Sequence, residues 1–161
     1  MRLTIRTNLA MRVLMACAVN SGHMVRRAEI AKAANASENH LAQVVHLLAN
    51  EGYIDTTRGR AGGIALARSP DSITIGDVFR HFEAGVPFAE CFAGADNTCP
   101  LSSVCRLRVA LMAALEAFYG VLDSMTLQDM VEDNAGLEAL LNLPHPDMML
   151  PQGGCTIAPQ L

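Results

Sequence analysis

The chain has 161 residues, which corresponds to one domain of ordinary size with room for an appended segment. Apolar residues make up 51% of it and charged residues 17%, a composition typical of a globular protein and not of a disordered one. No apolar run approaches the roughly 18–20 residues that a membrane-spanning helix needs, and no basic-then-apolar leader opens the chain. These features exclude membrane and secreted proteins and predict a cytoplasmic location.

The net charge of −4 conceals an uneven distribution. Residues 1–68 contain nine Lys and Arg against four Asp and Glu, a balance of +5, whereas residues 69–161 contain three against twelve, a balance of −9. A basic part joined to an acidic part indicates that only the first of them meets a polyanion such as nucleic acid.

Helical periodicity predicts three helices in the basic part of the chain. The first begins near Thr7, a possible cap, and has Leu14 and Cys17 on its apolar face. Two short helices follow, separated by a turn at Asn35, after which Ser37 is suited to cap the second of them. Two helices joined by a turn of about three or four residues form a helix-turn-helix.

A β-hairpin is predicted directly after these helices. Residues 53–57 and 63–67 are strand candidates, and the connection between them contains Gly59, Gly62 and Gly63, which allow positive φ. A helix-turn-helix followed by a hairpin is a winged helix.

The acidic part of the chain contains the longest periodic stretch. Residues 75–83 first predict a short helix, and from about 101 to 124 apolar residues then recur at spacings of three and four over about six turns. Such a stripe exceeds what a small winged domain buries, so we predict a helix that pairs with a second copy of the chain. Thr126 and Asp129 resemble the capping box of one more short helix.

The predicted fold class is therefore mainly α with a small β-hairpin: a winged helix-turn-helix DNA-binding domain plus a long dimerisation helix. We place the DNA-binding domain at 1–84 and a cysteine-containing loop at 85–103. The dimerisation helix with its short following helix occupies 104–143, and a flexible tail occupies 144–161.

Polar and basic side chains mark the surface that we expect to meet DNA. Asn and Gln side chains can pair with adenine edges, and an arginine at a wing tip can enter a minor groove or bind phosphates. A solvated helix face and a protein-binding winged helix are the alternatives, and the local basic charge favours DNA. The predicted DNA-binding residues are Ser37, Asn39, His40 and Gln43 on the second short helix, Arg58, Gly59 and Arg60 on the wing, and Arg2 and Arg26.

Three of the five cysteines lie close together with the spacing Cys91-x7-Cys99-x5-Cys105. In a reducing cytosol such a group favours a metal or redox site over disulfides. Structural zinc sites usually have shorter spacers and a fourth Cys or His, whereas iron–sulfur chemistry needs thiolates at three or four corners. The spacing favours a cluster and leaves a thiol switch, a zinc clasp and inert cysteines open.

Three thiols leave one corner of such a cluster without a ligand. The residue three positions past Cys105 is Arg108 and not a histidine, so a solvent molecule, a small thiol or a group from another subunit would complete the site. Incompletely ligated iron is open to attack by a small diatomic molecule or an oxidant, which would make the cofactor a sensor. The sequence has no phosphate-binding loop, nucleophile elbow or metalloprotease motif, and we expect no enzyme activity.

Several segments together resemble the Rrf-type winged-helix repressors, the group that includes NsrR, IscR and RirA proteins. They are MRLTIRTNLAMRVLM, SENHLAQVVHLLANEGYI, TRGRAGGIALA, SITIGDVFRHFE and the cysteine motif ending in CRLRVAL, and they extend over about residues 1–143. The resemblance implies a homodimeric transcription factor whose iron–sulfur cluster governs operator binding. The pair Asn39–His40 with the helix after it is most similar to the NsrR type, which is sensitive to nitric oxide.

That type implies a 4Fe–4S cluster on Cys91, Cys99 and Cys105, repression of genes for nitric oxide detoxification, and release of DNA when the cluster is nitrosylated. In related proteins the fourth ligand is an acidic residue of the partner subunit at the position that Asn8 occupies here. A neutral amide is a much poorer iron ligand than a carboxylate, so the fourth ligand is left unassigned, with Asn8 of the partner subunit as one candidate. RirA-like proteins have asparagine there, so an iron-responsive repressor is the alternative. IscR-like proteins with a 2Fe–2S cluster, the alternative cofactor, have a histidine in the place of Arg108.

Overall fold

The computed structural model describes residues 3–59, 62–94 and 97–143. The first elements are α1 (Ile5–Val19), α2 (Arg27–Ala33), α3 (Glu38–Asn50), β1 (Ile54–Thr57), β2 (Gly63–Leu66) and the 3-10 turn η1 (Pro70–Ser72). They are followed by α4 (Ile75–Glu83), the 3-10 turn η2 (Glu90–Phe92), α5 (Arg106–Asp123), α6 (Leu127–Val131) and α7 (Ala135–Leu141). The predicted class, mainly α with one small hairpin, is confirmed.

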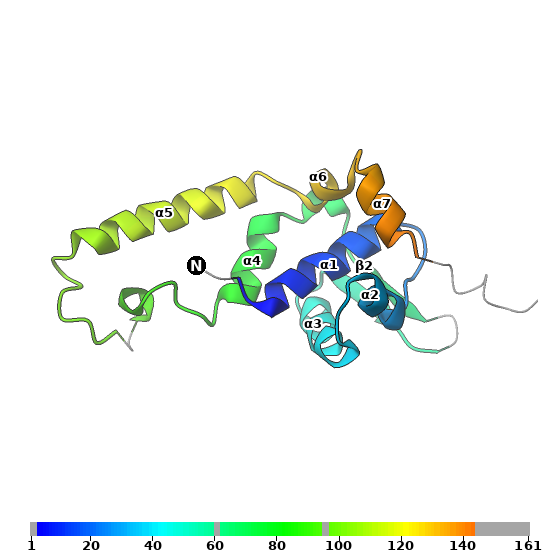
Figure 1. Cartoon of the computed structure of the whole chain (residues 1–161), viewed down its shortest axis with the longest axis horizontal. Helices are drawn as coiled ribbons and strands as arrows, with labels where there is room; N and C mark the ends of the chain where they lie inside the picture. Colours follow the sequence, from blue (N-terminus) through cyan, green and yellow to red (C-terminus); the bar gives the residue numbers. More distant parts are fainter. Residues whose placement is uncertain (1–2, 60–61, 95–96, 144–161) are drawn as a thin grey trace, which may run out of the picture.

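Helix α1 lies at the centre of the core, with α3, α4, α6 and β2 packed around it (Figure 1). Its predicted apolar face, which includes Leu14 and Cys17, is buried. The helix begins earlier than predicted because Thr4, not Thr7, is its cap: Oγ1 of Thr4 accepts a hydrogen bond of 3.2 Å from the backbone N–H of Thr7. Thr7 is fully buried, and its hydroxyl donates to the carboxylate of Glu83 at the end of α4.

Helices α2 and α3 form the predicted helix-turn-helix. Asn35 makes the turn with φ of +47°, and Leu41 and Leu48 on α3 are fully buried. Gly52, with φ of +68°, follows the end of α3 as expected. Ser37 stands at the cap position of α3, but its side chain makes no capping hydrogen bond, which corrects the role predicted for it.

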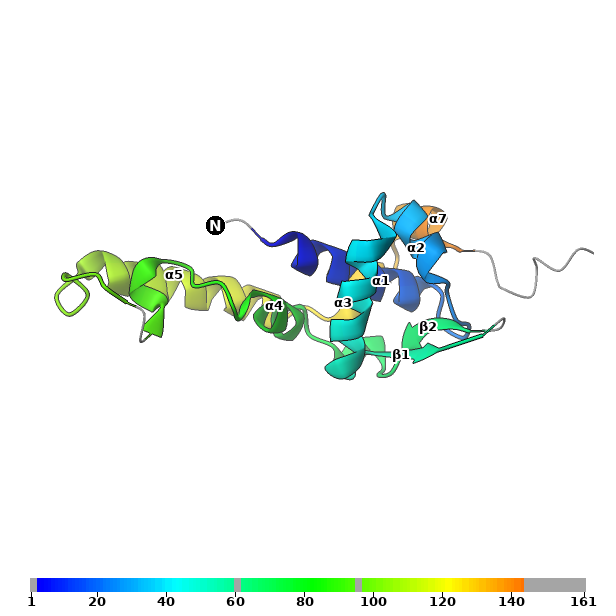
Figure 2. The same ribbon diagram turned by 90° about the horizontal axis from the view of Figure 1, so that it is seen from below.

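Strands β1 and β2 form the wing as an antiparallel hairpin with Ile54 opposite Leu66 (Figure 2). Val25, in the segment before α2, adds one further bridge through two backbone hydrogen bonds with Ile64 of 2.9 and 2.8 Å. This bridge fixes the hairpin against the helix-turn-helix, as a winged helix requires.

The glycines of the wing have two different roles. Gly59 has φ of +108°, as predicted for the turn. Gly62 and Gly63 do not have positive φ, which corrects the prediction. They are needed because a Cβ would lie 2.2 Å from the carbonyl oxygen of Thr57 at the first position and 2.8 Å from that of Val25 at the second.

Helix α5 begins at Arg106 and not near residue 101. Turns occupy the preceding residues, where the hydroxyl of Ser102 donates to the carbonyl of Cys99 at 3.0 Å and so competes with helix formation. No residue of α5 is buried, and Leu107 is 65% exposed. Together with residues 85–94 and 97–105, α5 projects from the body of the molecule (Figures 1 and 2); we refer to these residues as the arm.

Helices α6 and α7 return to the body and pack on α1. The predicted capping box is present, since the backbone N–H of Thr126 donates to Asp129 at 2.7 Å and that of Asp129 donates back to Thr126 at 3.2 Å. Leu127 and Leu141 are part of the core. The predicted unit 104–143 is thus divided between the arm and the body. The predicted tail lies outside the described residues, and no helix in the described ranges is long and apolar enough to cross a bilayer.

Candidate nucleic-acid interface and cysteine loop

The outer face of α3 presents a line of polar side chains. Asn39, Gln43, His46 and Asn50 are exposed and lie opposite the buried side of the helix. Figure 2 shows α3 crossing in front of α1. Nδ2 of Asn50 lies 3.3 Å from Nε2 of His46. His46 and Asn50 were not among the predicted DNA-binding residues, although continuing the helical spacing from Asn39 and Gln43 reaches both.

One edge of this face adjoins the start of α1. His40 and Gln43, both predicted, line a shallow hollow with Arg6 and Leu9 of α1. Arg6 therefore brings a positive charge beside the two predicted side chains. Ser37 is also exposed, at the first turn of α3.

The other edge of the face adjoins the wing. An open groove of about 670 Å³ separates α3 from the hairpin, and its basic lining residues are Arg26, Arg27 and Arg58. Gly59 lines the same groove, and the guanidinium of Arg27 lies 4.0 Å from the carboxylate of Glu38. The predicted contacts Arg2 and Arg60 lie outside the described residues.

A polar helix between two basic edges suits a nucleic-acid duplex. Arginines that bind phosphates fix the position of a protein on DNA, and amide side chains on an exposed helix read base edges in the major groove. The groove side supplies three guanidinium groups and the α1 side supplies one.

The three cysteines of the motif lie on the arm, at the opposite end of the molecule from the wing (Figure 1). Cys91 is in η2, Cys99 is in the segment after it, and Cys105 is the cap of α5; all three are free thiols of intermediate exposure. The backbone N–H of Arg108 donates to Sγ of Cys105 at 3.4 Å, and its Nε donates to the carbonyl of Cys91 at 3.3 Å. Arg108 thereby holds two of the cysteine segments together.

The described residues of the cysteine loop do not have the geometry of an assembled metal site. The backbone N–H of Cys99 donates to Oδ1 of Asn97 at 3.0 Å, and the hydroxyl of Thr98 donates to Glu90 at 2.6 Å. Within the described ranges, no three His, Cys, Asp or Glu side chains are arranged to hold a metal ion. The donor set itself, three free thiols on one segment, suits the soft ligand preference of an iron–sulfur cluster.

Cys17 and Asn8, both on α1, differ from these three thiols in their surroundings. Cys17 is buried on α1 as predicted, and burial raises the pKa of its thiol to about 12, which keeps it protonated at neutral pH. Asn8 is exposed at the start of α1, where its Nδ2 donates to the carbonyl of Thr4 at 3.3 Å.

A helix-turn-helix with a polar outer face, basic edges and a hairpin wing defines a DNA-binding winged-helix protein. The family described as Rrf2, iron-dependent transcriptional regulator, matches residues 3–133. The chain belongs to this family of DNA-binding regulators of transcription.

Relatives and solved structures agree with this assignment. The chain is 48% identical over 142 residues to the HTH-type transcriptional regulator NsrR of Geobacillus kaustophilus, covering 88% of this chain and 97% of that protein. It is 39% identical to NsrR of Bacillus subtilis, covering 89% and 99%. Among solved structures, T. potens IscR has a TM-score of 0.67 at 25% identity, covering 83% of this chain and 88% of that one. CymR, the global cysteine regulator of B. subtilis, has a TM-score of 0.63 at 27% identity, covering 81% and 96%. These relatives are regulators and not enzymes, as predicted for this chain.

Replacing Gln43 by alanine is expected to relax base preference at one operator position, because a paired amide contributes about 1–3 kcal/mol of discrimination. Arg58→Ala is the matched contrast: it should weaken binding to all sequences and reduce the salt slope by about one, as loss of a phosphate contact does. Binding is measured on single-base variants of a duplex selected from a random pool, at several salt concentrations. An equal loss on every sequence for Gln43→Ala would contradict the assigned contact.

Proposed function

We propose that this chain is a homodimeric cytoplasmic repressor that holds a 4Fe–4S cluster on Cys91, Cys99 and Cys105. Nitric oxide is its signal, and reaction with the cluster releases the operator. The observation that carries the proposal is the presence of three free, half-buried thiols on one segment that leads directly into α5. The relatives named NsrR support nitric oxide as the signal.

The residues of the arm have distinct parts in this proposal. The thiolates of Cys91, Cys99 and Cys105 hold the cluster, which supplies iron that a small diatomic molecule can attack. Arg108, on the first turn of α5, contacts both the Cys91 carbonyl and the Cys105 sulfur. A rearrangement of the thiols therefore acts directly on the start of α5.

A second copy of the chain is proposed to cover α5. The helix has no buried residue, and Leu107 and Val121, about four turns apart on the same face, are 65% and 62% exposed. An apolar helix face of this length is unfavourable in water and is covered efficiently by the same helix of a symmetry-related copy. In such a dimer the two arms lie together, and their relative angle sets the distance between the two copies of α3.

Two alternatives to this proposal each have one observation in their support. A cluster-free thiol switch is consistent with the absence, among residues 3–59, 62–94 and 97–143, of a group arranged to hold a metal ion. An iron-responsive repressor is consistent with the description of the family as iron-dependent and with asparagine at position 8.

Anaerobic purification followed by stepwise addition of nitric oxide tests the proposal. Visible absorption and iron content report the cluster and its 4Fe–4S or 2Fe–2S type, light scattering reports the mass of the dimer, and fluorescence anisotropy reports binding to a DNA duplex selected by the anaerobic protein. We expect a coloured dimer that releases DNA at a few molecules of nitric oxide per cluster. Release by an iron chelator but not by nitric oxide would overturn nitric oxide as the signal. A colourless, iron-free chain that binds DNA only when its thiols are reduced would overturn the cluster.

A further inference from the structure

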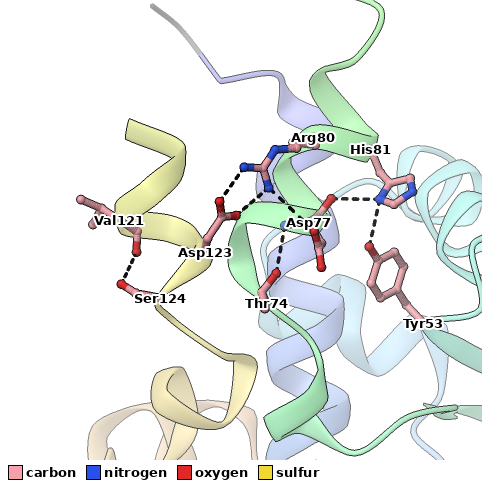
Figure 3. A network of polar contacts seen from close by, with 8 residues as sticks. All are labelled: Tyr53, Thr74, Asp77, Arg80, His81, Val121, Asp123 and Ser124. Carbon is pink, nitrogen blue, oxygen red and sulfur yellow. Dashed lines mark hydrogen bonds and ion pairs between the residues drawn. The ribbon is translucent and has the colours of Figure 1, made fainter. Parts of the chain in front are cut away.

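Helix α4 lies between the arm and the end of α3, and two successive residues of α4 contact these two parts. Figure 3 shows Arg80 directed toward Asp123 on α5, and His81 directed toward Tyr53 at the start of β1. Because α4 is a single short helix, both side chains move with one rigid element.

On the arm side, Arg80 makes a two-pronged ion pair. Its Nη1 and Nη2 each donate at 2.6 Å to one oxygen of Asp123, and its guanidinium lies 4.6 Å from the ring centre of Tyr119, also on α5. Gly76 makes room for the pair, since a Cβ there would lie 1.9 Å from Oδ1 of Asp123.

Arg80 and Asp123 form an ion pair at neutral pH. The hydrogen bonds from Arg80 lower the pKa of the Asp123 carboxyl below its ordinary value. The contribution of this carboxylate to stability is therefore complete above the ordinary pKa of aspartate and is lost only as the pH falls through the lower folded value. At neutral pH the contact between α4 and α5 is intact.

On the side of α3, His81 joins three groups. Its Nδ1 lies 3.0 Å from the hydroxyl of Tyr53 and 2.9 Å from the carbonyl of Asp77, and its Nε2 lies 3.2 Å from the carboxylate of Glu51. Glu51 is the residue that ends α3. Arg68 completes this cluster: it donates to the carbonyl of Glu51 at 2.6 Å and stacks 4.4 Å from the ring centre of Tyr53.

We propose that Arg80 and His81 are positioning residues that couple the arm to the reading helix α3. Arg80 holds α4 to the part of α5 farthest from the cysteines, and His81 holds α4 to the carboxyl end of α3 and the start of the wing. A displacement of α5 then reorients the DNA-binding face without any contact between the cysteine loop and DNA. This inference rests on the proposed function, because it needs a signal at the cysteines.

The test compares two states of the full-length chain. The wild type and each variant below are prepared with Cys99 intact and with Cys99→Ala, and the dissociation constant for the selected DNA duplex is measured for both forms. The dissociation constant of the Cys99→Ala form divided by that of the form with Cys99 intact is the regulatory ratio. We expect about 10-fold for the wild-type background, within the usual range of about 5–150-fold for coupled sites. Asp123→Asn and Tyr53→Phe, which remove one contact on each side of α4, are expected to bring this ratio to within about twofold of one.

Three further variants separate coupling from general damage. Glu116→Gln removes the same charge from an exposed position on α5 and should keep the wild-type ratio. Gly76→Ala, which displaces the Asp123 carboxylate sterically, should act like Asp123→Asn. Arg80→Lys, which keeps the charge but loses the two-pronged geometry, should give an intermediate ratio. Visible absorption shows that each chain with Cys99 intact is loaded, and the thermal midpoint shows that every protein, with or without Cys99→Ala, is folded.

The possible outcomes are distinct. A wild-type ratio near one would reject the proposed function itself. A wild-type ratio that persists in Asp123→Asn, Gly76→Ala and Tyr53→Phe would overturn the coupling while leaving the proposed function standing. Loss of the ratio in these variants, with absorption and thermal midpoint unchanged, would support it.

Discussion

Replacing Cys99 by alanine is expected to abolish the iron content and visible absorption of the anaerobically purified chain. Three thiols are the minimum that an iron–sulfur cluster accepts from a protein when one corner is filled from elsewhere, so a chain with two of them no longer retains it. No other described cysteine replaces the lost ligand, because Cys17 is buried on α1 with its pKa raised to about 12. Iron per chain and absorption are measured on protein that has not been exposed to air.

Cys17→Ala is the matched control, because it removes a thiol from the core and leaves the arm unchanged. We expect it to retain the iron content and spectrum of the wild type. A Cys99→Ala chain with the wild-type spectrum would show that Cys91 and Cys105 suffice or that another group ligates. Loss of iron from both variants would show that general destabilisation, and not ligand removal, explains the result.

The DNA-binding half of the fold could be predicted because its signals are local. Each of these signals depends on residues a few positions apart: the turn at Asn35, the end of α3 before Gly52 and the hairpin connection that contains Gly59. The polar face of α3 follows from helical spacing alone, and of its line of side chains only His46 and Asn50 were not among the predicted contacts. Boundaries were less certain where side chains compete with the backbone, as Ser102 does before α5.

The arrangement of the cysteines could not be predicted from their spacing. The spacing identifies three thiols on one segment, but the contact of Arg108 with both Cys91 and Cys105 depends on how the loop folds back onto α5. The sequence also gives no indication that α7 forms and that α6 and α7 belong to the core, because their partners are on α1.

The contacts of α4 were beyond sequence reasoning for the same physical reason. Arg80 and Asp123 are 43 positions apart, and Tyr53 and His81 are 28 apart. Helical spacing shows which residues share a face of one helix, but not which distant residue they meet. Gly76 illustrates this, since only the position of the Asp123 carboxylate explains why a side chain there is not tolerated.

Replacing Asn20 by alanine is expected to lower the free energy of unfolding by about 2–4 kcal/mol, because a buried polar partner left without a hydrogen bond costs about 1–3 kcal/mol. Asn20 is only 3% exposed at the end of α1, and its Nδ2 donates to the carbonyls of Ala16 and Leu141 at 2.7 and 2.6 Å. Its Oδ1 accepts from the backbone N–H of Leu143 at 3.0 Å, so the same amide holds the end of α7 against α1. Urea unfolding should show a midpoint lower by on the order of 1–2 M with an unchanged slope. Asn8→Ala, the same change at an exposed site on α1, should lower the free energy of unfolding by less than about 0.5 kcal/mol. Equal urea midpoints for the two variants would show that α7 is held by its apolar contacts alone.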